Sequence, residues 1–194
     1  MKARIQVFLL LLSLTVPAMS QTRETRTLLV RDLTGAKVTY SFDVLSYAPP
    51  MGLPFLSAPS TTPPATPVGM VQELLSSVVR NDFDTYKTLW DPVSFSEIES
   101  TAMSNFAAWQ ADLGTVSVAV TNVVLFSKFT VVRVTFIDKI QGQRLSDSQM
   151  VLGQCTDRLC FTNQFSKHPV VAFWNDPDGD VTVVTPLQGQ QAVR

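Results

Sequence analysis

Apolar and polar positions alternate near the start of the chain in the way that β-strands do. An apolar run at residues 28–30 and turn-forming residues at 32–35 precede apolar side chains at every second position, Val38, Tyr40, Phe42 and Val44. Alternation with period two is typical of a strand that buries one face. The pattern therefore predicts a β-hairpin within residues 21–47.

The spacing of apolar residues becomes helical after residue 66. A first helix is predicted over residues 67–80, because a Thr-Pro pair precedes apolar side chains three and four positions apart. A short second helix is predicted from Asp82 to a stop at a proline, which cannot continue the backbone hydrogen bonds. A third is predicted to begin at Ser94 or Ser96, each followed by a glutamate three residues on, and to end at Gly114.

β-branched and aromatic residues dominate after residue 115 and indicate strands. The predicted strands cover residues 116–124, 129–137, 145–152, 159–165, 170–174 and 181–184. The turns between them are too short for the crossovers that parallel strands need. The sequence therefore predicts the α+β class, with helices followed by an antiparallel sheet.

A proline-rich stretch separates the predicted hairpin from the helices. Seven prolines fall within residues 48–67, among serine, threonine and alanine, and this composition favours an extended linker. The predicted organisation is a hairpin segment at 21–47, a linker at 48–66, a domain at 67–187 and a polar tail at 188–194. Because an isolated hairpin is marginal in water, we expect it to dock on the domain or on a partner.

The run from Val71 to Pro92, VQELLSSVVRNDFDTYKTLWDP, resembles the opening of the nuclear transport factor 2-like (SnoaL-like) superfamily. In that superfamily a long helix ends in a polar-Asp-Phe or Leu turn, and a second helix ends in Trp or Phe before an acid and a proline. The resemblance covers residues 67–166. It implies three N-terminal helices packed on a strongly curved, cone-like antiparallel sheet, here preceded by the hairpin.

The resemblance implies a pocket at the open end of the cone. Some members of the superfamily are isomerases, dehydratases, hydrolases or cyclases, and many only bind a ligand or another protein, so the fold alone does not decide the function. A homodimer formed through the sheet face is also implied. Catalytic positions differ between its families, and none can be carried over residue by residue.

The chain has 194 residues, of which 45% are hydrophobic and 16% charged. This composition is typical of one globular domain with additional terminal segments. The formal net charge is −1, spread along the chain without a basic run. A nucleic-acid partner is therefore not predicted, since such proteins carry a basic stripe.

Residues 1–20 have the pattern of a secretory signal. Lys2 and Arg4 precede an apolar stretch at 7–16, and a small-x-small site ends at Ser20, with cleavage predicted before Gln21. The alternative, a retained anchor, is disfavoured because the stretch is about half of what a membrane-spanning helix needs. We expect a periplasmic or extracellular protein that does not span a membrane after cleavage.

Export changes the interpretation of the two cysteines. Four residues lie between Cys155 and Cys160, and thiols in an oxidising compartment tend to pair. We expect a disulfide that closes a tight turn. Two free thiols, or a metal or redox pair, are the alternatives, although a redox motif has two intervening residues and a zinc site needs more ligands.

Five side chains are the candidates for ligand binding, all within the predicted cone. Three are aromatic residues at helical spacing, which more often belong to an ordinary core, and two are charged residues on neighbouring strands; the set is Tyr86, Trp90, Trp109, Arg133 and Asp147. Arg133 shares a face with Phe129, Val131 and Thr135, so it points either to solvent or into the cone, and Asp147 is its candidate partner.

Other candidate chemistry is weak. His168 is the chain's one histidine and is interpreted as a surface residue, and no serine has the surroundings of a nucleophile. The acids at 176, 178 and 180 resemble a calcium loop but lack its bidentate acid, so a hairpin turn is preferred. No cofactor or metal is predicted.

The sequence therefore favours an exported, non-enzymatic protein that binds a partner protein or a small ligand. The alternative is a small-molecule isomerase or dehydratase with acid-base residues inside the cone. An enzyme needs ionisable groups that converge in a pocket, whereas a binding module can have a cone filled with apolar side chains.

Overall fold

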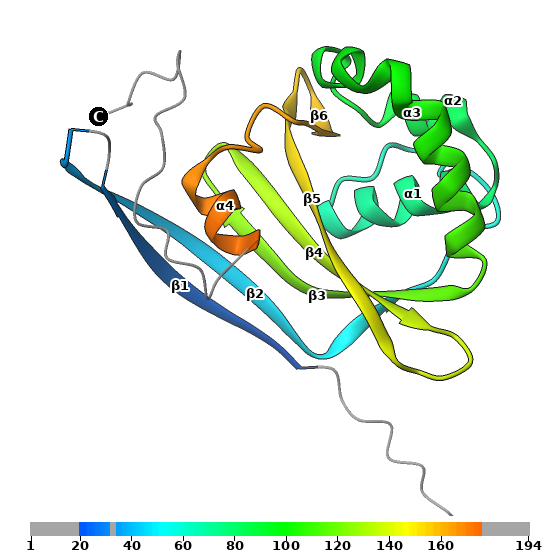
Figure 1. Ribbon diagram of the computed structural model, residues 1–194, viewed down its shortest axis with the longest axis horizontal. Coiled ribbons are helices and arrows are strands. Elements are labelled where there is room, and N and C mark those ends of the chain that lie inside the picture. Colours follow the sequence, from blue (N-terminus) through cyan, green and yellow to red (C-terminus); the bar gives the residue numbers. More distant parts are fainter. Residues whose placement is uncertain (1–19, 32–33, 176–194) are drawn as a thin grey trace, which may run out of the picture.

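A computed structural model describes residues 20–31 and 34–175 of the chain. Its centre is one six-stranded antiparallel sheet whose strands lie side by side in chain order (Figure 1). The strands are β1 (Ser20–Arg31), β2 (Lys37–Leu53), β3 (Val116–Phe126), β4 (Phe129–Asp138), β5 (Arg144–Cys155) and β6 (Arg158–Phe161). The predicted strand at 181–184, the acidic turn before it and the signal segment lie outside the described residues.

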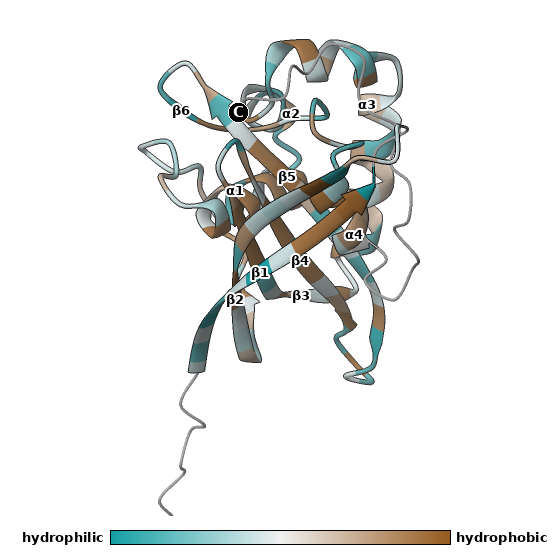
Figure 2. Cartoon of the chain, turned by 90° about the vertical axis from the view of Figure 1, so that its left-hand side faces the viewer, coloured by the Kyte–Doolittle hydropathy of each residue, from teal (hydrophilic) through white to brown (hydrophobic). Residues whose placement is uncertain are grey.

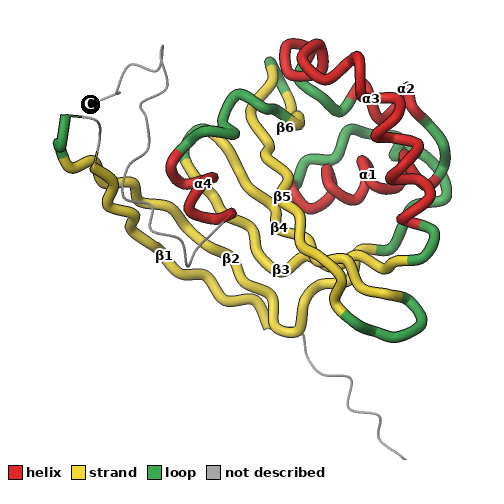
Figure 3. Tube along the Cα trace, viewed as in Figure 1, coloured by secondary structure: helices red, strands yellow, loops and turns green. Residues whose placement is uncertain are grey.

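Four helices in the described part of the chain cover the two faces of the sheet. α1 (Pro67–Val79), α2 (Phe83–Thr88) and α3 (Pro92–Leu113) lie on one face, and α4 (Pro169–Asn175) lies on the other, against β1 to β4 (Figure 3). The predicted fold of three N-terminal helices on a sheet is therefore wrong. Two strands of the sheet come first, the helices lie in the middle of the chain, and four more strands follow.

The N-terminal hairpin belongs to the sheet because β2 pairs with β3 as well as with β1. β2 is paired with β3 at residues 43–46 and 51–53, with an irregular stretch between them that contains a cis bond before Pro49. β2 thus runs through residues that the proline content assigned to a linker. The alternation of apolar residues over 38–44 predicted this strand correctly. It does not show with which strand, besides β1, β2 pairs.

Two apolar cores lie on the two faces of the sheet. The larger core joins α1, α2 and α3 to β3, β4 and β5, and its most buried members are Met70, Val71, Leu74, Leu75, Val78, Val120, Val132, Val134 and Leu152. The smaller core joins the hairpin to α4, through Leu28, Val30, Phe42, Val44, Val124, Phe129, Val131, Val170, Val171 and Trp174. Figure 2 shows that β1 begins with hydrophilic residues and becomes hydrophobic where it lies beside α4.

The chain before α1 is held to that helix by polar side chains. Gln72 donates to the Pro54 carbonyl at 2.8 Å, and Arg80 Nη1 donates to the Leu56 carbonyl at 3.1 Å. Arg80 Nη2 also donates to Glu73 at 2.7 Å, and Glu73 is only 2% exposed. This buried ion pair therefore fixes part of the proline-rich stretch on α1.

Side-chain caps explain where the helices begin. Thr66 caps α1, Asp82 caps α2 and Asp91 caps α3 by accepting from the Ser94 backbone N–H. The third helix thus begins before both serines predicted to start it. The second helix was predicted to stop at Pro92, but α2 already ends at Thr88. Pro92 instead occupies the first position of α3, where its missing N–H costs nothing.

α4 occupies residues for which a strand was predicted. A short apolar run does not distinguish a buried strand from a buried helix, and here the residues before it decide. His168 Nδ1 accepts from the Val170 backbone N–H at 3.2 Å, which caps the helix, and Pro169 takes the first helical position.

His168 is buried rather than on the surface, where the sequence placed it. It is 7% exposed and lies among the rings of Tyr40, Phe126 and Phe129, with centroids about 5 Å apart. Burial, aided by the nearby charge of Lys128, lowers the pKa of this imidazole to about 4. The histidine is therefore neutral near pH 7.

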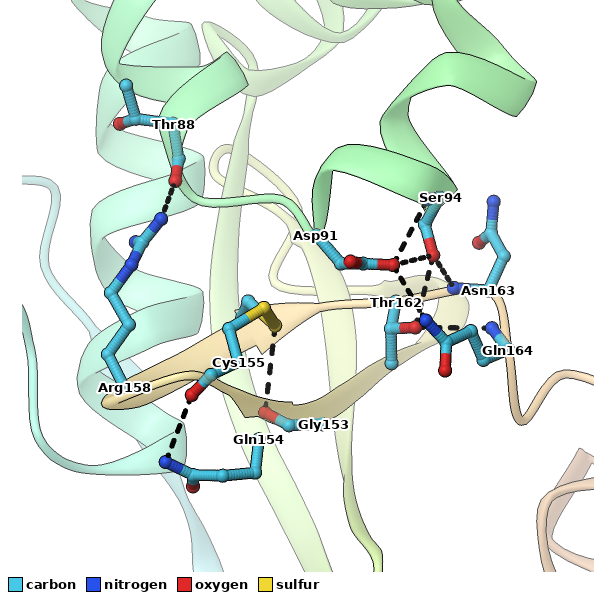
Figure 4. The surroundings of a disulfide bond; sticks show 11 residues. Thr88, Asp91, Ser94, Gly153, Gln154, Cys155, Arg158, Thr162, Asn163 and Gln164 are labelled. Carbon is cyan, nitrogen blue, oxygen red and sulfur yellow. Dashed lines mark hydrogen bonds between the residues drawn. A yellow bond between two sulfur atoms is a disulfide. The ribbon is translucent and has the colours of Figure 1, made fainter.

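The predicted disulfide is confirmed. Cys155 and Cys160 are bonded across the β5–β6 turn, with a Cα–Cα distance of 5.9 Å. Figure 4 shows β6 held to the start of α3 beside this bond: Ser94 Oγ donates to Asp91 and accepts from the Asn163 backbone N–H. No helix in the described part of the chain is long and apolar enough to cross a membrane.

The first prediction concerns the Glu73–Arg80 pair. Arg80→Met leaves the Glu73 carboxylate buried without its cation, so we expect the free energy of unfolding in urea to fall by about 3–5 kcal/mol. The matched control is the double variant Glu73→Leu/Arg80→Met, which removes both charges and is expected to recover most of the loss. A loss in the double variant as large as in the single one would contradict this account.

The second prediction is a pH dependence caused by His168. In the unfolded chain the imidazole takes up a proton near pH 6.5, whereas in the folded chain it does so only near pH 4. The unfolded state binds more protons between these values, so the free energy of unfolding falls by up to about 3 kcal/mol as the pH drops from 6.5 to 4.

His168→Asn is the matched control for that measurement. Asparagine keeps an acceptor for the Val170 N–H but does not titrate, so the slope of unfolding free energy between pH 6.5 and about 5 should vanish. The carboxylates with lowered pKa values, Asp43, Asp82, Asp91 and Asp147, add their own slope only below about pH 5, where the unfolded chain begins to protonate them. An unchanged slope in the variant would contradict the assignment.

Candidate binding site at the edge of strand β5

The first half of β5 forms an open edge of the described sheet. β6 pairs only with Leu152–Cys155, so residues 144–150 have β4 on one side and no described strand on the other. In Figure 1 this part of β5 lies beyond the end of β6, next to the loop that leads into it from β4. An open edge presents backbone groups that a further strand can pair with.

Antiparallel geometry indicates which backbone groups face outward here. The Val151 carbonyl points outward, since it accepts from the Thr162 backbone N–H at 3.1 Å. Backbone groups alternate in direction along a strand, and β4 pairs with residues 146–153 of β5 without a register shift. The N–H and carbonyl groups of Gln149 and Asp147 therefore point outward as well.

An apolar hollow of about 320 Å³ lies on the helix side of this edge. The end of α3, the start of β3 and strands β4 and β5 enclose it, and its lining residues are Trp109, Asp112, Leu113, Thr115, Val116, Phe136, Leu145, Ser146, Asp147 and Ser148. Leu145 is 55% exposed, which is unusual for a leucine in a sheet. The hollow therefore offers an apolar surface with a few hydrogen-bonding groups at its rim.

A polar hollow of about 340 Å³ lies on the opposite side of the same edge. It is lined by Arg133, Asp147, Ser148 and Gln149, so the two hollows share Asp147 and Ser148. The side chain of Gln149 carries an amide oxygen that is buried and has no hydrogen-bond partner among the described residues. A buried acceptor of this kind is satisfied when a donor binds next to it.

Asp147 is surrounded by donors. Arg133 donates to it from Nε at 3.1 Å and from Nη2 at 2.7 Å, Thr135 donates at 2.8 Å, and both Nε and Nη2 of Arg144 donate as well. Burial alone raises the pKa of this carboxyl, but the hydrogen bonds from Arg144, Thr135 and Arg133 outweigh it and hold the pKa below its ordinary value.

On the side of the polar hollow, the charges sum to one excess positive charge, whereas Asp112 lines the apolar hollow on the other side. Two guanidinium groups, Arg133 and Arg144, meet the single carboxylate of Asp147. An arginine that already holds one carboxylate still attracts a second anionic group, because its guanidinium carries five donors. The polar hollow is therefore suited to an acidic group.

The structure divides the five predicted binding residues among three places. Tyr86 and Trp90 lie inside the larger core, in an aromatic cluster with Phe83, Phe106 and Phe161, and do not line a described hollow. Trp109 lines the apolar hollow. Arg133 and Asp147 are paired as expected, but Arg133 lies on the face away from α1 to α3, so it does not point into the cone.

Sequence reasoning missed Leu145, Ser146, Ser148 and Gln149. A signal was present, because residues 144–149 are more polar than the other predicted strands although they follow a strand rich in valine. Such polarity is typical of a strand that is incompletely covered. The alternation of side chains assigns residues to the two faces of β5, but it does not show that the pairing of β5 with β6 stops at Leu152.

No group of three or more His, Cys, Asp or Glu side chains that could hold a metal ion occurs within residues 20–31 and 34–175. Comparison with known proteins gives no relative: no family model, no curated protein and no solved structure matches the chain. The function is therefore inferred from the geometry of the chain itself.

The third prediction compares the two arginines bound to Asp147. The Arg133 side chain is 25% exposed and that of Arg144 is 64% exposed. We expect Arg133→Ala to lower the free energy of unfolding by about 1–3 kcal/mol, because it removes the more buried of the two guanidinium groups that bind the Asp147 carboxylate. Arg144→Ala should cost less than about 1 kcal/mol, as exposed ion pairs do. Equal losses in urea unfolding would contradict this ranking.

Proposed function

We propose that this is an exported protein that binds an extended segment of a partner protein as an added strand along residues 144–150 of β5. The observation that carries the proposal is the open edge between two hollows of different character, which share Asp147 and Ser148. Strand addition uses backbone hydrogen bonds for affinity and side-chain pockets for specificity.

The two hollows fit the alternation of a bound strand. Successive side chains of a strand point to opposite faces, so every second residue of the segment enters the hollow beside Trp109 and the others face Arg133. The first set is then apolar. The second set is acidic, since two arginines and one aspartate lie on that side. A segment with alternating apolar and acidic residues is the expected ligand.

Export to the periplasm or the extracellular space is supported by two features. The chain begins with the pattern of a signal segment, and a disulfide joins Cys155 and Cys160. Disulfides persist in oxidising compartments and are rare in the reducing cytosol.

Binding is favoured over the acid-base enzyme because the ionisable candidates do not converge. Tyr86 is buried in the larger core, where burial raises the pKa of its phenol, while Arg133 and Asp147 lie at the sheet edge and are bound to each other. Catalysis by proton transfer needs such groups around one reacting atom. The paired charges at this edge instead suit recognition of a charged group.

We also propose that residues 67–166 are related to the nuclear transport factor 2-like superfamily. Three features support this proposal: Asn81 follows the end of α1 in a left-handed backbone conformation, α2 ends before Asp91 and Pro92, and antiparallel strands follow the helices. The two strands at the N-terminus extend the sheet beyond what the resemblance implied.

The fourth prediction tests strand addition with a defined probe. A fluorescein-labelled seven-residue peptide of alternating leucine and aspartate should bind, and its affinity should fall as salt is added. The same peptide with lysine in place of aspartate is the control and should bind at least about tenfold more weakly, since like charges meet at the arginines. Fluorescence anisotropy measures both.

Two variants locate the binding surface. Gln149→Pro removes an outward N–H while leaving the ladder to β4 intact, and should weaken binding of the aspartate peptide by about tenfold. Trp109→Ala should weaken it by at least about tenfold, whereas Met103→Ala, an exposed apolar residue of α3 outside the hollow, should not. Equal binding of both peptides, or unchanged affinity in Gln149→Pro, would refute the proposal.

A further inference from the structure

The outer side of β1 is a second open backbone edge, at the opposite end of the sheet from β6. β1 has twelve residues and pairs, within the described part of the chain, with β2 alone. Its first eight residues are exposed. The edge therefore has the length and accessibility that a further strand requires.

The charges on β1 are placed on two faces. Glu24 and Arg26 point to the same face, where Arg26 Nε donates to Glu24 at 2.6 Å. Arg23 points to the other face and donates to Asp43, which also accepts from the Thr25 hydroxyl at 2.6 Å. Arg23 is thus held by the neighbouring strand β2. Glu24 and Arg26 pair only with each other along β1, with Arg26 also over the Trp174 ring at 5.3 Å, and both side chains remain about half exposed at the edge. Their charges therefore decide what can lie against this edge.

These two charges select one register for a second copy of the strand. Antiparallel pairing about a twofold axis perpendicular to the sheet keeps each face continuous, and opposite residues then share a face. The register centred on Thr25 sets Glu24 of each copy opposite Arg26 of the other. Moving the centre by one residue sets Glu24 opposite Glu24, or Arg26 opposite Arg26, and like charges directly opposite are destabilising.

We infer that two copies of this chain associate through β1, antiparallel and centred on Thr25, so that their sheets join into one. Two Glu24–Arg26 ion pairs form across the junction, and the exposed backbone groups of both edges become paired. This surface lies at the other end of the sheet from the β5 edge, so the inference is independent of the proposed function. It also differs from a dimer formed through the sheet face.

Charge exchange tests the register. Sedimentation equilibrium of the processed full-length chain should show a concentration-dependent monomer–dimer equilibrium. Glu24→Arg and Arg26→Glu should each weaken the dimer by about tenfold, because each sets like charges opposite one another. The double variant Glu24→Arg/Arg26→Glu should restore it, and so should an equimolar mixture of the two single variants, in which every cross-strand pair is again of opposite charge.

Cross-linking gives a second readout that does not depend on these charges. Cα atoms of directly opposite residues lie about 4.5–5.5 Å apart, within the range of a disulfide, so Thr25→Cys should form an interchain disulfide under mild oxidation. Gln21→Cys is the matched control and should remain monomeric, because this position lies opposite Leu29. A chain that stays monomeric, single variants that do not recover on mixing, or equal cross-linking at both positions would overturn the inference.

Discussion

The pairing of β2 with β3 is the constraint on which the rest of the structure depends. It makes the N-terminal hairpin part of the sheet, because β2 is the one described strand with which β1 pairs. The apolar face of the hairpin then lies opposite α4, and the smaller core forms between them around Val44 and Trp174. With both helical layers in place, the two ends of the sheet formed by the described strands have open backbone, and both proposed interaction surfaces lie there.

α4 covers only part of the sheet face on which it lies, and this explains the polar character of the candidate site. α4 has seven residues and packs over the part of β4 that contains Phe129 and Val131. Two residues further along the same face of β4, Arg133 replaces an apolar side chain and pairs with Asp147. A partly exposed charge is tolerated only where it is hydrogen-bonded, and Asp147 accepts from three side chains. The same strand therefore contributes to a core at one end and to a charged rim at the other.

Local signals in the sequence predicted the elements better than their arrangement. The Thr66–Pro67 pair, Asp82 and the valine-rich strands have short-range causes, namely caps and side-chain alternation, and these elements were found. Pairing of β2 with β3, the end of β6 at Phe161 and the burial of His168 depend on residues far away in the chain. The helix at Pro169–Asn175 was taken for a strand, since five apolar residues satisfy either interpretation and the cap at His168 is an unusual one. Of the candidate site, Trp109, Arg133 and Asp147 were named, whereas Gln149 was not, because its significance comes from the unpaired edge.

Amide hydrogen exchange tests strand addition at β5 most directly. The N–H of Ser148 points toward β4, while those of Asp147 and Gln149 point outward. In the free protein, the outward amides should therefore exchange quickly and Ser148 slowly. Saturation with the leucine–aspartate peptide should slow exchange at Asp147 and Gln149 and leave Ser148 unchanged. Fast exchange at both outward amides in the saturated complex would contradict the account.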